Sequence, residues 1–147
     1  MIVDPDINKE ILIGKVDEEG LKNYSVFDEA DVYYEHYKVD KGIAAKIAVD
    51  SENIKIKVVF GSWCGDSKIN VPAFQKIVKE SGFDKTNIEY YAVDRKKTGG
   101  DVDLSALNVK YVPTFIFYRD NKEIGRIVEY PKGKSLEEDW LNIVSEK

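Results

Sequence analysis

The sequence predicts an α/β fold in which a central mixed β-sheet is covered by helices on both faces. From residue 54 onward, short β-branched or apolar runs alternate with helical segments in the order β-α-β-α-β-β-α. The chain has 147 residues, of which 43% are hydrophobic and 33% charged, the balance of one folded domain rather than of a disordered chain. We expect a domain over residues 52–147, with residues 1–51 packed on it as an extension.

The first 51 residues predict a mostly helical extension. Residues 11–13 are compatible with a short strand, but residues 26–35 carry apolar side chains at mixed helical spacing. Asp40 is expected to cap a second short helix with Ile43 and Ile47 on its apolar stripe. The aromatic residues and the histidine here are expected to be packing or structural groups: Phe27, Tyr33, Tyr34, His36 and Tyr37.

Local patterns predict each element of the domain. A helix is expected over residues 67–81, because apolar residues recur on one face and Gly82 is a typical stop. Asp101 or Asp103 would cap a short second helix, and Ser135 begins a capping box before the last one. Strands are expected at residues 54–60, 88–93, 114–118 and 124–128.

Charge and composition exclude several function classes. The 22 Lys and Arg residues against 27 Asp and Glu give a formal charge of −5, whereas nucleic-acid binding needs a concentrated basic face. The longest basic run, residues 95–97, is expected to be a solvated loop, with an anion-binding patch as the alternative. Because no stretch predicts a membrane span or a secretory signal, we expect a cytoplasmic protein, with a mature exported form as the alternative. We also expect a monomer that binds neither nucleic acid nor membrane.

The chain contains one cysteine, Cys64, and one histidine. This count excludes an intramolecular disulfide and a four-ligand Cys/His zinc site. We therefore expect no metal and no cofactor. Any redox cycle through Cys64 requires a thiol from another molecule.

Cys64 lies where a predicted strand ends and a predicted helix begins. A thiol in the first helical turn faces unpaired backbone N–H groups and the positive end of the helix dipole, and both favour the thiolate. Ser67 lies one turn further on and could donate a hydrogen bond to the sulfur, Lys68 adds positive potential and Asp66 opposes it. The alternative for a lone cysteine, a small buried apolar residue, fits this context less well.

These residues carry a family resemblance. The segment from Trp63 to Lys68 resembles the active site of the thioredoxin superfamily, normally WCxxC followed by a basic residue. Pro72 falls where thioredoxins have the proline that kinks the active-site helix, and Val112-Pro113-Thr114 is similar to their cis-proline loop. Residues 120–123 resemble the hairpin turn before the last strand. The resemblance covers residues 52–146 and implies a thioredoxin-like fold.

The resemblance also implies site roles. Cys64 and Ser67 occupy the catalytic positions of the motif. A cis bond before Pro113 would leave the backbone of Val112 open to an extended substrate strand, whereas the alternative is that Pro113 merely starts an edge strand. The substrate-binding positions are Trp63, Gly65, Asp66, Val112, Pro113 and Thr114.

The sequence departs from the family at two positions. Ser67 replaces the second cysteine, which in dithiol thioredoxins resolves the mixed disulfide. Val58 stands where thioredoxins carry a buried acid thought to assist that cysteine. The joint loss indicates a monothiol CxxS design, although an engineered Cys-to-Ser replacement at residue 67 would give the same sequence.

The leading hypothesis is a monothiol protein of cell redox homeostasis. Cys64 would act in disulfide isomerisation or mixed-disulfide reduction, on a disulfide-containing protein or a low-molecular-weight thiol, with an external resolving thiol. The main alternative is a redox-inactive module that binds peptides or proteins. A glutaredoxin-type iron–sulfur carrier is less favoured, because Glu129-Tyr130-Pro131 replaces the glycine pair and aspartate that cradle glutathione. Peroxide reduction is weaker still, since the peroxidase motif is absent.

Overall fold

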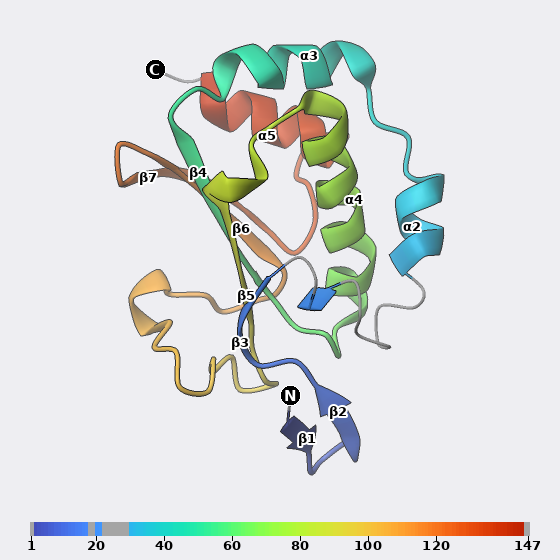
Figure 1. Cartoon of the computed structure of the whole chain (residues 1–147), viewed down its shortest axis with the longest axis vertical. Helices are drawn as coiled ribbons and strands as arrows, with labels where there is room; N and C mark the ends of the chain where they lie inside the picture. The colour runs from blue at the N-terminus through green and yellow to red at the C-terminus, as the bar shows by residue number, and fades with distance from the viewer. Residues whose placement is uncertain (1, 18–19, 22–29, 146–147) are drawn as a thin grey trace.

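A five-stranded mixed sheet organises the molecule (Figure 1). The computed structural model describes residues 2–17, 20–21 and 30–145. The central strand β4 is parallel to β5 and antiparallel to β6, while β3 and β7 are antiparallel edge strands. The predicted mixed α/β sheet is thus confirmed. Its order is β3 (Gly14–Val16), β5 (Ile88–Ala92), β4 (Ile54–Phe60), β6 (Thr114–Arg119) and β7 (Lys122–Val128).

The side chains of β4 alternate between the two faces of the sheet, which carry apolar clusters of different size. Ile54, Ile56 and Val58 point to the same side and are almost fully buried, as the period of two in a strand requires. Val59 points to the other side and is also buried. The central strand therefore supports two separate apolar clusters.

The larger cluster lies under the helices. Strand β4 leads into α4, and residues of α4 and α5 pack on the sheet around the fully buried Trp140. The Trp140 ring stacks on Phe74 with centroids 5.4 Å apart, and its Nε1 donates to Ser51 Oγ at 3.1 Å. Helix α4 ends at Gly82, whose φ of 73° is left-handed, as predicted. The helices are α2 (Ala30–His36), α3 (Lys41–Asp50), α4 (Gly65–Ser81) and α5 (Leu136–Ser145).

Among the described residues, those packed on the other face belong to no α-helix, which corrects the prediction of helices on both faces. The segment between β5 and β6 contains a single 3₁₀ turn, η3 (Ser105–Leu107), in place of the expected short helix. Asp103 accepts a hydrogen bond from Ser105 N, but Asn108 adopts a left-handed φ of 52° and ends the turn. A second 3₁₀ turn, η2 (Lys85–Asn87), precedes β5.

The N-terminal region begins with strands, so the predicted mostly helical extension is wrong. Strands β1 (Ile2–Asp4) and β2 (Lys9–Ile11) form an antiparallel hairpin, and β3 extends the central sheet beside β5. Each of these strands is only three residues long, which is too short for its side-chain alternation to be recognised in the sequence. The strand β3 is moreover stabilised by pairing with β5, far along the chain. The division at residues 51 and 52 stays a prediction, and Phe27 lies outside the described residues.

Helix α3 begins at the predicted cap. Asp40 accepts hydrogen bonds from Gly42 N and Ile43 N at 2.9 and 3.1 Å, which satisfies donors that the first helical turn leaves free. None of the described helices is long and apolar enough to cross a membrane.

A buried carboxylate of α5 bonds to the segment between α2 and α3. Glu137 in α5 is only 1% exposed. It accepts hydrogen bonds from the Tyr37 hydroxyl and from Asp40 N, the latter at 2.9 Å. Burial raises the pKa of Tyr37 above its ordinary value, and the hydrogen bond and charge of Glu137 add to this rise.

We predict that Tyr37→Phe lowers the free energy of unfolding at pH 7 by about 1–3 kcal/mol, because it removes a partner from a buried carboxylate. The unfolded chain loses this phenolic proton near pH 10, whereas the folded chain holds it to higher pH. The stabilisation is therefore present below pH 10 and lost as pH rises toward the folded-state pKa. Urea unfolding from pH 7 to 11 should show the two proteins converging at high pH, with the exposed Tyr130→Phe as control.

Candidate functional site

Cys64 is the N-cap residue of α4. It has extended backbone angles (φ −93°, ψ 127°), and its carbonyl accepts a hydrogen bond from Lys68 N at 3.0 Å. Its own N–H donates to Gly61 O at 3.0 Å, which closes the turn between β4 and α4. The half-buried thiol thus stands at the N-terminus of a 17-residue helix that contains Pro72.

The sulfur faces the loop that begins β6. Cys64 Sγ donates to Val112 O at 3.4 Å, and the Val112–Pro113 peptide bond is cis. Thr114 Oγ1 donates to Tyr111 O at 2.6 Å, and Glu129 N donates to Pro113 O at 2.6 Å. The structure therefore brings Cys64 together with residues 112–114, which are 48 or more residues away in sequence.

Ser67 is buried behind the turn and not exposed beside the sulfur. Its exposed fraction is 0%, and its Oγ accepts a hydrogen bond from Gly61 N at 3.1 Å. The sequence suggested that this hydroxyl donates to Cys64 Sγ, but the contact that the structure shows is with Gly61. Ser67 therefore fixes the end of β4 against the first turn of α4.

Trp63 is held from several sides. Its Nε1 donates to Val93 O at 2.9 Å, and Lys97 Nζ lies 5.3 Å from the ring centroid, a cation–π distance. The ring packs directly on Gly61, where an added Cβ would come within 2.5 Å of it. Glycine is therefore required at residue 61 for this ring position.

Gly65 and Asp66 form the start of α4. Gly65 is exposed, and an added Cβ there would meet nothing within 4 Å. Asp66 is half-buried in the first helical turn, where a negative charge is favourable for the helix dipole. The open space at Gly65 leaves this side of Cys64 accessible.

Several residues of the site have no clear signal in the sequence. Ser62 Oγ, fully buried, accepts a hydrogen bond from Leu12 N at 3.0 Å. The basic run at residues 95–97 is not simply a solvated loop, because Lys97 packs on Trp63 and Arg95 forms an ion pair with Asp4. These contacts join residues 30 or more positions apart, and only the folded chain reveals them.

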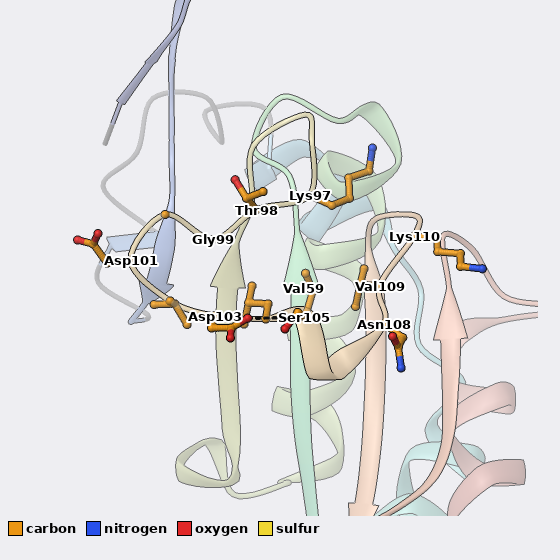
Figure 2. A pocket seen from close by; sticks show the side chains of 13 residues that line it. Val59, Lys97, Thr98, Gly99, Asp101, Asp103, Ser105, Asn108, Val109 and Lys110 are labelled. Carbon is orange, nitrogen blue, oxygen red and sulfur yellow. Dashed lines mark hydrogen bonds between the residues drawn. The ribbon is translucent and has the colours of Figure 1, made fainter.

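A cavity of about 540 Å³ lies beside this site, between the sheet and the segment that follows β5 (Figure 2). Val59 forms part of its lining from the sheet, and residues 97–105 and 108–110 form the rest. Asp101 and Lys110 lie at opposite ends of the view in Figure 2.

Among the described residues, no group of three or more His, Cys, Asp or Glu side chains is arranged to hold a metal ion.

Comparison with known proteins agrees with this geometry. A family model described as thioredoxin matches residues 14–138. The chain belongs to the thioredoxin family. The match begins at β3, so it includes part of the region that the sequence had placed outside the domain.

Two curated thioredoxin relatives come from Arabidopsis thaliana. A TPR repeat-containing thioredoxin is 27% identical over 114 residues, which cover 78% of this chain and 28% of that protein. Thioredoxin-like 3-3 is 27% identical over 81 residues, which cover 55% of this chain and 58% of that protein. The chain thus spans less than two thirds of each of these relatives.

A solved structure supports the same fold across nearly the whole chain. It is a protein of unknown function from Pseudomonas aeruginosa, with a TM-score of 0.63 and 15% identity. The superposition covers 90% of this chain and 92% of that one. This similarity concerns the fold alone.

We predict that Ser67→Ala lowers the free energy of unfolding by about 1–3 kcal/mol, because the buried Gly61 N–H loses its acceptor. Urea denaturation measures the change. Ser145→Ala, at an exposed serine near the end of α5, is the control and should change stability by less than about 0.5 kcal/mol. Equal effects of the two substitutions would contradict the role given to Ser67.

Proposed function

We propose that this thioredoxin-family protein catalyses thiol–disulfide exchange through Cys64 alone, with the resolving thiol supplied by another molecule. The observation that carries the proposal is the position of the Cys64 sulfur. It stands at the N-terminus of α4, half exposed and 3.4 Å from the carbonyl oxygen of Val112. The sulfur of a cysteine is the nucleophile in disulfide exchange, and this one is held at a partly exposed turn beside the loop that begins β6.

The exchange proceeds in two balanced steps. The Cys64 thiolate attacks one sulfur of a disulfide R–S–S–R′, forms Cys64–S–S–R and releases R′–S⁻. An external thiolate R″–S⁻ then attacks the R sulfur, giving R–S–S–R″ and restoring the Cys64 thiolate. The number of disulfides is unchanged, so the cycle needs no other oxidant or reductant. Isomerisation of a protein disulfide and removal of a thiol cap both fit this scheme.

The residues around Cys64 supply the docking surface in this proposal. Trp63, Gly65 and Asp66 lie on the side of the α4 turn and are exposed or half-buried. Residues 112–114, on the side of β6, are buried and lie beneath this surface. The partner is a protein with a disulfide or a mixed disulfide of a low-molecular-weight thiol. Exposed Tyr111, 58% accessible, extends the apolar part of this surface.

The redox-inactive binding module remains the second candidate function, and one observation favours it. Ser67 is fully buried and hydrogen-bonded to Gly61 N, so the position of the resolving cysteine has a structural use here. Under this candidate, the same surface binds a peptide and Cys64 takes no part in chemistry.

We predict that Cys64→Ser reduces exchange to the uncatalysed rate, since no other thiol exists in the chain. A fluorogenic mixed disulfide of glutathione, with excess glutathione as resolving thiol, measures the rate. The matched control is Cys64→Ser combined with Ser67→Cys, which keeps one thiol per chain but buries it. That variant should also show only the uncatalysed rate.

The single variant Ser67→Cys separates the two candidates. If the unaltered protein exchanges disulfides and Cys64→Ser does not, Cys64 is the nucleophile. If the unaltered protein is inactive and activity arises only in Ser67→Cys, the exchange function is wrong and the binding module is favoured.

A further inference from the structure

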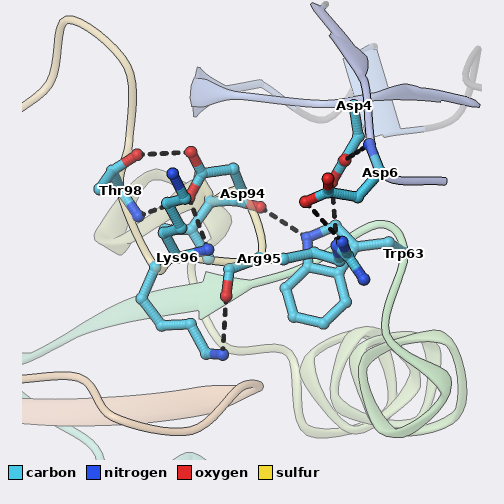
Figure 3. Close-up of polar contacts among 9 residues, drawn as sticks. Asp4, Asp6, Trp63, Asp94, Arg95, Lys96 and Thr98 are labelled. Carbon is cyan, nitrogen blue, oxygen red and sulfur yellow. Dashed lines mark hydrogen bonds and ion pairs between the residues drawn. The ribbon is translucent and has the colours of Figure 1, made fainter. Parts of the chain in front are cut away.

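The N-terminal hairpin reaches the loop that follows β5 (Figure 3). Asp4 at the end of β1 has a side chain only 7% exposed, and its Oδ2 accepts from Arg95 Nε at 3.1 Å. Asp6 Oδ2 pairs with Arg95 Nη2 at 2.8 Å, and Asp6 N donates to Asp4 Oδ1 at 2.8 Å. Two carboxylates of the hairpin thus hold one guanidinium, as the fork of arginine donors allows.

Arg95 lies between the two residues of this loop that contact Trp63. Val93 O accepts from the indole N–H, and Lys97 Nζ lies over the ring and also donates to Arg95 O at 3.1 Å. Lys97 adopts a left-handed φ of 66°, which is uncommon for a residue with a side chain.

Asp94 holds the loop in this conformation. Its carboxylate accepts hydrogen bonds from the backbone N–H groups of Lys96 and Thr98 at 3.0 and 2.9 Å, and from Thr98 Oγ1 at 2.7 Å. The loop is therefore ordered internally by Asp94 and attached to the hairpin by Arg95.

A second contact joins the residue after the hairpin to the residue before Trp63. Leu12, directly after β2, donates its backbone N–H to the fully buried Ser62 Oγ at 3.0 Å. Ser62 is the residue before Trp63. The segment 2–12 thus touches both chain segments that position the tryptophan.

We propose that the β1–β2 hairpin positions the exchange site, with Asp4 and Arg95 as positioning residues that act through Trp63 on Cys64. This proposal rests on the proposed exchange function. Trp63 is the covalent neighbour of Cys64, so the ring contacts that fix the indole also fix the backbone that presents the sulfur. Small displacements of reacting groups have large effects on rate.

The hairpin strand β1 contributes little else to the fold. Ile2 and Val3 are 41% and 57% exposed, so this strand adds little apolar burial. Its most buried side chain is the Asp4 carboxylate, which points at Arg95. A purely structural strand would instead be expected to bury its apolar residues.

The test uses Arg95→Ala and Asp4→Asn in the full chain, with three measurements. Acrylamide quenching of tryptophan emission reports on Trp63, because Trp140 is only 1% exposed and shielded from the quencher. Alkylation of Cys64 by iodoacetamide at pH 7 reports on the sulfur, and exchange with the glutathione mixed disulfide reports on the reaction. Urea unfolding gives the global stability for comparison.

We expect each variant to increase quenching about twofold and to slow alkylation and exchange about tenfold, with unfolding midpoints close to that of the unaltered protein. Arg95→Lys retains the charge and should recover part of the loss. Lys134→Ala is the control, because Lys134 is an exposed lysine outside this loop; it should leave all measurements unchanged.

Two results would overturn the proposal. In the first, Arg95→Ala and Asp4→Asn lower the unfolding midpoint but leave quenching and alkylation unchanged. In the second, quenching increases while alkylation stays as in the unaltered protein, which would separate Trp63 from Cys64. If the unaltered protein catalyses no exchange at all, the exchange function fails, and quenching with alkylation still decide whether the hairpin positions the site.

Discussion

The hydrogen bond from Gly61 N to Ser67 Oγ is the contact on which the geometry of the site depends. The chain turns from β4, which ends at Phe60, into α4, which begins at Gly65. This buried hydrogen bond joins the residue directly after β4 to the first turn of α4. Because the acceptor is fully buried, water cannot replace it. Cys64 lies between the two bonded residues, so the same contact places its sulfur at the helix N-terminus.

This contact also gives a physical reason for serine at the position of the family's second cysteine. A hydroxyl oxygen is a good acceptor for a backbone N–H, whereas a thiol sulfur is a weak one. Serine at residue 67 thus leaves the chain with one thiol and gives the turn a buried acceptor. In this chain the single thiol and the bond that joins the end of β4 to α4 both depend on one residue.

Local sequence patterns were sufficient to predict the elements that a chain builds from its own neighbours. The β-branched run of β4, the Asp40 cap and the left-handed stop at Gly82 all depend on contacts within a few residues. Residues 11–13 were compatible with a strand, but the hairpin of β1 and β2 and the edge strand β3 were not predicted. These strands are only three residues long, and β3 is stabilised by pairing with the distant β5. The ion pair of Asp4 with Arg95 was not predicted because these residues are 91 positions apart.

The surroundings of Cys64 limit the directions from which an external thiol would approach in the proposed exchange. Ser67, one turn into α4, is fully buried, and the carbonyl of Val112 occupies the side toward β6. The side of Gly65 is open, since this residue is exposed and has free space where a side chain would stand. Under the two proposals, Trp63 next to Cys64 would also help to guide the incoming disulfide and the external thiol. In the proposed exchange, the external thiolate must reach the substrate sulfur bonded to Cys64, so a fixed Trp63 would keep the same opening available for both steps.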